Sequence, residues 1–252
     1  MELKAEQIQA NWSEFLGFIE NNISGIRGEK LKEFYLKHEE EFMLMPASHK
    51  TAYHNAFPGG YIDHVNRVIK GALSINAVWR EFGAEQNYTI EELVFSAINH
   101  DLGKLGEEDN YAHIPSEDEW RKKNMGEMYQ FNKSISYMSV PDRSIKLLAD
   151  NDIKLTQNEW LAIKLHDGLY DPANEPYLKS YMPETRPRTS LVFIVHQADL
   201  MASRIEFEKE WLPKFNSKEI KKDNFKVKSK STKTKALSSI KSEGLANLFN
   251  EL

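Results

Sequence analysis

Apolar residues recur every three or four positions over most of the chain, which is the spacing of amphipathic helices. The first such stretch covers residues 5–23, and a second lies around residues 31–42. Residues 25–28 interrupt the pattern with two glycines. We therefore predict a helical hairpin over residues 1–45, packed against the main part of the molecule.

The same periodicity predicts further helices in residues 46–215, over about 61–82, 90–100, 142–150, 157–167 and 189–210. Two of them begin with the Thr-x-x-Glu spacing of a capping box, at Thr89 and Thr156. Residues 191–195 would also suit a buried strand, but their apolar stripe continues as far as Ile205, which favours a helix. Residues 46–60 and 171–188 have loop composition, and 102–140 show no clear pattern. Because no hairpin signal is visible, the predicted class is all-α.

The composition changes in residues 216–252. Residues 218–235 contain eight lysines and few apolar side chains, which predicts a flexible basic linker. This linker could contact nucleic-acid phosphates weakly, or it could be only a solvated tether. The last 17 residues again have apolar residues at helical spacing. We expect the basic arm to end in a short amphipathic helix.

Composition narrows the chemistry. The chain has 252 residues, 40% hydrophobic and 28% charged, with a net charge of -5, which is typical of a soluble globular protein. It has no cysteine, so disulfides, thiolate nucleophiles and cysteine-bound zinc are excluded. A metal site must use histidine and carboxylates, which suit Mn, Fe, Co, Ni, Zn or Mg. Because there is no signal-peptide pattern and no long apolar run, we expect a cytoplasmic protein without membrane contact.

Three predicted helices each carry an ionisable side chain on their apolar stripe. These are His64, Asp101 beside His100, and Asp199. Such a group is costly to bury unless it is paired, hydrogen-bonded or bound to metal. Each one alone could be a core histidine, a helix cap or an ion-pair partner. Convergence on one cation would explain all of them together, and would leave positions open for water and a phosphate oxygen.

Four segments sharpen this hypothesis: YHNAFPGGYIDH, NHDLGK, KLHDG and HQADL, in that order. Together they resemble the HD superfamily of metal-dependent phosphohydrolases, over residues 46–206. The branch that looks most similar contains HD-domain 3′–5′ exoribonucleases and related phage or plasmid proteins. The resemblance implies an HD-domain helical bundle over residues 46–215. It also implies that His64, His100, Asp101 and Asp199 bind one divalent metal ion, with a second ion possible.

The resemblance implies hydrolysis of a phosphoester by metal-activated water. The candidate catalytic residues are Asp101, Lys104 and His166. Lys104 could pair with Asp101 or neutralise the phosphoryl group. His166 could donate a proton to the leaving oxygen or bind a second metal. His54 and His113 are weaker candidates for the same roles.

Other residues could support the site. His196 precedes Asp199 by one helical turn and could orient it. Arg67 follows His64 by one turn, and Arg186 and Arg188 lie in the loop before the Asp199 helix. All three arginines could bind an anionic substrate, although Arg67 could equally form a plain salt bridge.

Three functions remain open. The leading hypothesis is a phosphohydrolase acting on a nucleoside mono- or triphosphate. The first alternative is a nuclease or phosphodiesterase on single-stranded nucleic acid, recruited by the tail. The C-terminal segment LANLFNEL could simply pack back on the domain, but it also resembles peptides that hold a sliding clamp, with Leu245, Leu248 and Phe249 as anchors. The second alternative is a binding module that holds metal without turnover.

Overall fold

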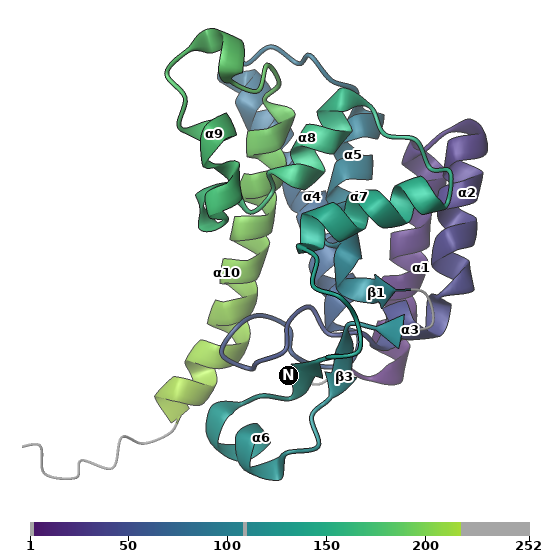
Figure 1. Ribbon diagram of the computed structural model, residues 1–252, viewed down its shortest axis with the longest axis vertical. Helices are drawn as coiled ribbons and strands as arrows, with labels where there is room; N and C mark the ends of the chain where they lie inside the picture. The colour runs from purple at the N-terminus through teal and green to yellow at the C-terminus, as the bar shows by residue number, and fades with distance from the viewer. Residues whose placement is uncertain (1–2, 108–109, 218–252) are drawn as a thin grey trace, which may run out of the picture. The chain divides into compact units, whose positions relative to one another are not determined.

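The structure is a computed structural model, and most of the residues that it describes lie in helices (Figure 1). These are residues 3–107 and 110–217. The described residues up to Pro213 form one compact unit. Lys214 begins a second unit, of which only the end of the last helix is described.

The N-terminal helices pack on the core through aromatic side chains. They are α1 (Ala5–Asn22), α2 (Gly25–Lys37) and α3 (Glu39–Leu44). Helix α1 contacts α2 and α3 on one side and the core helices α4 and α5 on the other. The Phe15 and Tyr35 rings meet edge to face with centroids 4.7 Å apart, and Trp12 Nε1 donates a hydrogen bond to Glu39 Oε1 at 2.6 Å. The hairpin is therefore part of the hydrophobic core.

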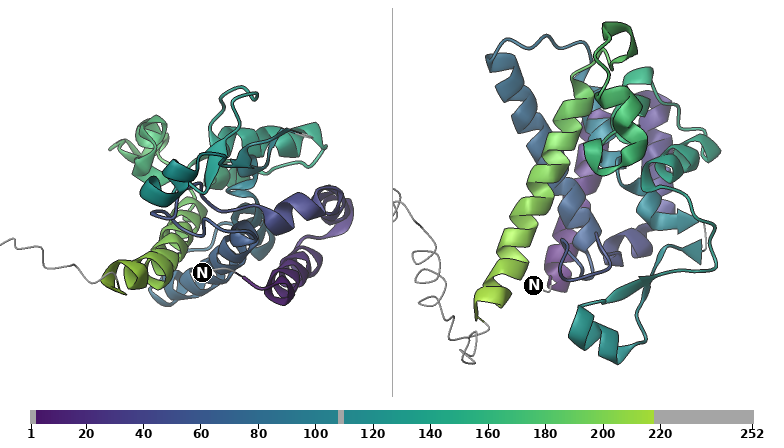
Figure 2. Two further views of the ribbon diagram at one scale, coloured as in Figure 1. Left: turned by 90° about the horizontal axis from the view of Figure 1, so that it is seen from below. Right: turned by 60° about the vertical axis from the view of Figure 1, so that its left-hand side comes forward.

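Five further helices contribute most of the remaining helical structure among the described residues. They are α4 (Gly60–Glu81), α5 (Ile90–Asn99), α7 (Val140–Asp150), α8 (Gln157–Lys164) and α10 (Leu191–Ser217). Helix α5 packs against α4 and α8, and α7 packs against α8. Helices α4 and α10 run side by side (Figure 2). A β-carbon at Gly71 would lie 2.7 Å from Met201 Cε and 3.6 Å from Ala198 Cβ, so α4 and α10 are in close contact at this glycine.

Local sequence signals account for several boundaries. Thr89 accepts a hydrogen bond from the backbone N–H of Glu92 at 3.0 Å, and the Glu92 carboxylate accepts one from the Thr89 N–H at 2.8 Å. Thr156 and Glu159 form the same reciprocal pair. Both predicted capping boxes are therefore confirmed. Residues 191–195 begin a helix and are not a strand.

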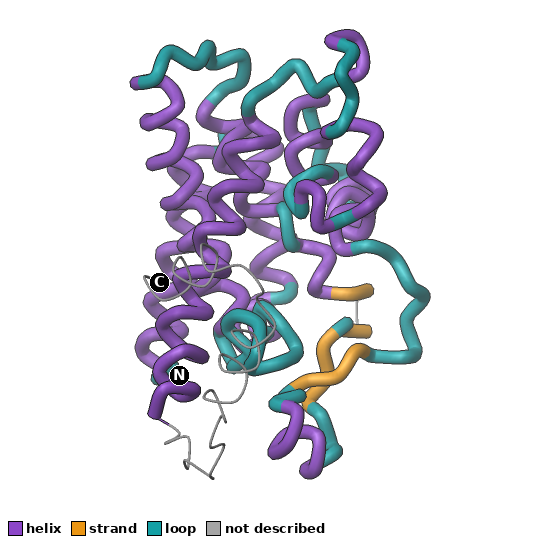
Figure 3. Tube along the Cα trace, turned by 90° about the vertical axis from the view of Figure 1, so that its left-hand side faces the viewer, coloured by secondary structure: helices purple, strands orange, loops and turns teal. Residues whose placement is uncertain are grey.

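The all-α class needs a correction between α5 and α7. A short 3-10 helix, η1 (Leu102–Leu105), leads into two small antiparallel sheets, β1 (Gly106–Glu107) with β2 (Asn110–Tyr111) and β3 (His113–Pro115) with β4 (Tyr129–Phe131). Helix α6 (Glu119–Met125) lies between β3 and β4, and the strands gather at one edge (Figure 3). Strands of two or three residues are too short to show alternation in sequence. The fold is therefore mainly helical, with two small sheets.

The predicted loop over residues 171–188 contains short helical turns, η3 (Pro172–Asn174), α9 (Glu175–Leu178) and η4 (Pro183–Thr185), and a further turn, η2 (Gly168–Tyr170), comes directly before it. None of the described helices has the length and apolar character needed to cross a membrane. The predicted basic linker, residues 218–235, lies outside the described residues, as do Leu245, Leu248 and Phe249.

Candidate metal centre

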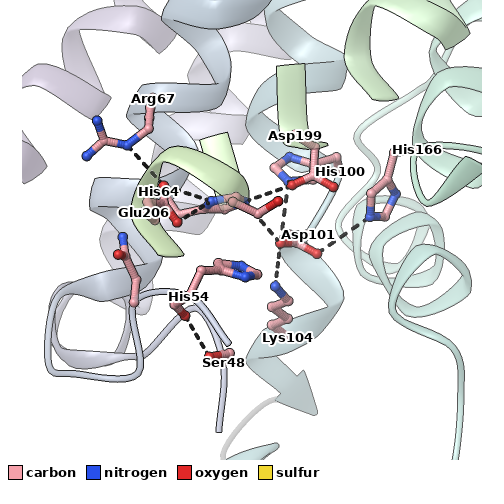
Figure 4. Close-up of polar contacts among 12 residues, drawn as sticks. Ser48, His54, His64, Arg67, His100, Asp101, Lys104, His166, Asp199 and Glu206 are labelled. Atoms are coloured by element: carbon pink, nitrogen blue, oxygen red, sulfur yellow. Dashed lines mark hydrogen bonds and ion pairs between the residues drawn. The ribbon is translucent and has the colours of Figure 1, made fainter. Parts of the chain in front are cut away.

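Three helices bring the four predicted metal ligands to one place (Figure 4). His64 lies in the second turn of α4, His100 and Asp101 follow the last residue of α5, and Asp199 lies on α10. The two imidazoles are fully buried, and the side chains of Asp101 and Asp199 are 5% and 20% exposed. Asp199 is the most accessible of the four, which leaves the site open on that side.

The ligand atoms lie at distances that a shared cation would set. His64 Nε2 is 3.2 Å from Asp199 Oδ1 and 3.6 Å from Asp101 Oδ2. His100 Nε2 is 3.4 Å from Asp101 Oδ2 and 3.9 Å from Asp199 Oδ1. Ligands bound at about 2.1 Å from one ion lie roughly 3–4 Å from each other. The ligand atoms of His64, His100 and Asp101 all lie within 4.8 Å of one another, so these three groups fit a single divalent cation. Asp199 Oδ1 lies close to both imidazole nitrogens and could join them, and Asp199 also forms a group with His166 and Asp167.

The outer nitrogens of the two histidines fix the tautomer. His100 Nδ1 is 2.8 Å from the carbonyl oxygen of Ala97, and His64 Nδ1 is 3.1 Å from both carboxylate oxygens of Glu206. Because these oxygens only accept hydrogen bonds, each Nδ1 carries the proton. The neutral ring then presents its Nε2 lone pair to the centre, which is the state that binds metal.

Both buried Nε2 atoms lack a hydrogen-bond partner among the described residues. His64 Nε2 faces Asp199 Oδ1, and His100 Nε2 faces Asp101 Oδ2, an oxygen that is also paired with Lys104 Nζ. In the neutral rings the two nitrogen lone pairs have no donor, which is costly for buried groups. A cation at their meeting point would satisfy both of them, so the residues present fit a metal ion.

The charges in the cluster favour a cation as well. Burial would raise the pKa of Asp101, but Lys104 and His100 hold it well below the usual value. Burial alone would lower the pKa of His64, whereas Glu206 and Asp199 raise it to about 10. Without metal, the neighbouring carboxylates therefore favour a protonated, positively charged His64. Binding of a metal ion at His64 Nε2 should release that proton.

Lys104 and His166 reach the Asp101 carboxylate from other sides. Lys104 Nζ is 2.5 Å from Asp101 Oδ2, and His166 Nε2 is 3.6 Å from Asp101 Oδ1. His166 Nδ1 donates to the carbonyl oxygen of Ile163 at 2.8 Å, so its Nε2 also points inward. His166, Asp167 and Asp199 form a second group whose ligand atoms lie within 4.8 Å of one another. This group could hold a second ion.

The other predicted histidines lie around the same pocket. His54 stands over His64, with ring centroids 4.7 Å apart, and burial lowers its pKa. His113 lines the neighbouring cavity together with His54 and His196. His196 Nδ1 donates to the carbonyl oxygen of His166 at 2.6 Å, so this histidine supports the His166 segment.

The predicted substrate-binding arginines are not brought to the pocket. Arg67 is held by Glu206 at 3.0 Å and by Asp63 at 3.1 Å, so its guanidinium already has two carboxylate partners. Arg186 and Arg188 are exposed and line a separate cavity beside α8. Arg186 Nε donates to the carbonyl oxygen of Ser180 in its own loop at 2.5 Å. In this structure none of the three arginines faces the metal ligands.

Glu206 is the residue that the sequence analysis missed. It is only 2% exposed and accepts from both His64 Nδ1 and Arg67 Nε. A signal was present, because Glu206 continues the stripe of Asp199 and Ala202 two turns along α10. A buried carboxylate bonded to the outer nitrogen of a metal-binding histidine orients the ring and fixes its tautomer.

We expect Glu206→Gln to weaken metal binding about ten- to a hundred-fold, because loss of such a partner typically has an effect of this size. Isothermal titration of Zn²⁺ into the metal-free protein measures the affinity. Glu208→Gln is the matched control, since Glu208 is exposed on the same helix. Equal affinities for the two variants would show that Glu206 does not support the metal site.

Comparisons with known proteins identify no relative of this chain. No protein-family model matches the chain, and searches of curated proteins and of solved structures return no match.

Proposed function

We propose that the chain is a divalent-metal-dependent phosphohydrolase of the HD type, which cleaves a phosphoester of a nucleotide-type substrate. Two features support this proposal. One is the order of the four sequence segments that resemble the HD superfamily. The other is the geometry of His64, His100, Asp101 and Asp199.

The main observation in support of the proposal is that two buried imidazole nitrogens without hydrogen-bond partners point to one place beside an open cavity. His64 Nε2 and His100 Nε2 have no hydrogen-bond partner among the described residues. Asp199 and Lys104 line a cavity of about 620 Å³ that adjoins them. A purely structural metal site is usually closed by protein ligands, whereas a catalytic site keeps a position open to substrate.

The protein's own groups can then be given roles. A divalent cation in this site would polarise a phosphoryl oxygen and lower the pKa of water. Lys104 Nζ, held by Asp101, places a positive charge at the cavity wall near the phosphoryl group. His166 Nε2 faces the same carboxylate and is placed to hold a proton for the leaving oxygen.

The test is a hydrolysis screen with the full chain. Chelator-treated protein is supplied with Mn²⁺, Co²⁺, Ni²⁺, Zn²⁺ or Mg²⁺ and offered nucleotides and short oligonucleotides. Elemental analysis of the purified protein runs alongside. We expect phosphoester cleavage that depends on added metal and at least one ion per chain. Hydrolysis that chelation leaves intact would contradict the proposal, and so would a metal-loaded protein that cleaves nothing.

We expect His166→Ala to lower kcat about a hundred-fold or more while the metal content stays the same, because proton transfer by a placed side chain contributes about 10²–10⁴. Steady-state kinetics and elemental analysis on one preparation give both numbers. An unchanged kcat would show that His166 does not take part in catalysis. A parallel loss of one ion per chain would instead make it a ligand of a second metal.

A further inference from the structure

The cavity beside the metal ligands indicates the kind of substrate, if the proposed function holds. Its volume of about 620 Å³ is within the roughly 300–1,000 Å³ of small-molecule pockets. It is bounded by separate parts of the fold, including the loop before α4, strand β4, the η2 turn and helix α10. A bound molecule would therefore contact several elements at once.

Aromatic side chains in this wall are unusually exposed. Tyr53, Phe131 and Tyr170 line the cavity and are 51%, 46% and 70% exposed. They come from the loop before α4, from β4 and from η2. Exposed aromatic faces in a concave pocket are suited to stacking on a flat ring, and stacking tolerates different bases.

The same cavity has few lysine or arginine side chains that could bind a second or third phosphate group. Among the described residues, its lysines and arginines are Lys104, Arg143 and Arg204. Lys104 is paired with Asp101 at 2.5 Å. Arg143 is 4% exposed, and its Nη2 donates to the carbonyl oxygen of Ser136 at 2.7 Å. Only Arg204 is exposed at the surface of the cavity.

Acidic side chains further disfavour binding of additional phosphate groups in this cavity. Asp167 and Asp199 line the cavity as well. Sites for polyphosphates normally gather several arginine or lysine side chains around the extra phosphates. For phosphates beyond the one at the proposed metal site, Arg204 is the single exposed lysine or arginine among the described residues of this cavity, and the other neighbours include carboxylates and aromatic carbon.

We infer that the substrate carries a single phosphate group on an aromatic base, as a nucleoside monophosphate does. Tyr53, Phe131 and Tyr170 form the surface that contacts the base, while the phosphate lies at the metal ligands. This inference rests on the proposed function, and it selects the monophosphate over the triphosphate and over nucleic acid.

The test compares AMP, ADP, ATP, ribose 5-phosphate and a short oligoadenylate with Mn²⁺-loaded full-length protein. We expect kcat/KM for AMP to exceed that for ATP and for the oligonucleotide at least ten-fold, and to exceed that for ribose 5-phosphate by a similar factor. Tyr53→Leu and Tyr170→Leu should each lower the ratio of AMP to ribose 5-phosphate hydrolysis about ten-fold, in line with the energy of stacking on one base.

Tyr181→Leu is the matched control, because Tyr181 is 92% exposed and does not line this cavity. Its ratio should equal that of the unchanged protein. Preference for ATP or for the oligonucleotide would overturn this inference and leave a metal-dependent phosphohydrolase standing. Equal losses in the Tyr53, Tyr170 and Tyr181 variants would overturn the base-contacting surface. Failure to hydrolyse any of these compounds with any metal would overturn the inference together with the proposed function.

Discussion

Asp101→Asn is expected to yield a folded protein that binds little divalent metal and has lost at least about a thousand-fold in kcat/KM. The amide keeps the shape of the side chain but removes the negative charge that faces His64, His100 and Lys104. Metal catalysis contributes several kcal/mol to transition-state stabilisation, and about 1.4 kcal/mol corresponds to ten-fold in rate. Elemental analysis and steady-state kinetics on the same preparation measure both effects.

Asp142→Asn is a suitable control for that experiment. Asp142 also pairs with a lysine, at 2.6 Å from Lys164 Nζ, but its side chain is 48% exposed on α7 and does not line the cavity. An exposed pair of this kind contributes little to stability, so this variant should keep its metal and its activity. Full turnover in a metal-free Asp101→Asn protein would refute the proposed chemistry.

The largest expected effect on stability is at Gly103, where a single added methyl group should destabilise the fold. In Gly103→Ala the new β-carbon would lie 2.1 Å from the carbonyl oxygen of Val140 and 2.9 Å from Arg143 Cβ. The Gly103 N–H donates to Ser144 Oγ at 2.8 Å, so η1 cannot move away from α7 without losing that bond. We expect a loss of about 3 kcal/mol in the free energy of unfolding and a Tm lower by about 10 °C.

Gly17→Ala is a control that should change the free energy of unfolding in the opposite direction. Gly17 lies inside α1, and the nearest atom to its added β-carbon would be 3.8 Å away. Alanine in a helix interior is favoured over glycine by about 0.5–1 kcal/mol, so this variant should be slightly more stable. Denaturant unfolding of both variants checks the pair. A Gly103→Ala protein as stable as the parent would mean that η1 and α7 are not packed as described.

The sequence could predict the inward-facing ligands because helical periodicity reveals a polar residue on an apolar stripe. His64 and Asp199 each interrupt such a stripe, and the structure brings them to the pair His100 and Asp101. Glu206 obeys the same rule, because it continues the Asp199 stripe one turn beyond Ala202, although the sequence prediction does not include it. Periodicity shows which face a residue occupies, but it does not show which hydrogen bond the residue makes.

The positions of loop residues could not be derived in this way. Arg186 and Arg188 precede the Asp199 helix in sequence, but their segment runs beside α8 and forms another cavity. Tyr53, Phe131 and Tyr170 lie far apart along the chain, and only the folded path of a loop, strand β4 and the η2 turn brings them to one cavity. The sheets between α5 and α7 were missed for a related reason, since pairing such as that of His113 with Phe131 is set by tertiary contacts.

The central claim is that four side chains from α4, the end of α5 and α10 bind one divalent cation. Crystals of the Zn²⁺-loaded protein, measured on both sides of the zinc absorption edge, locate the ion directly by anomalous scattering. We expect a peak at about 2.0–2.2 Å from His64 Nε2, His100 Nε2 and a carboxylate oxygen of both Asp101 and Asp199. A fully loaded protein whose anomalous peak lies away from these atoms would contradict the account.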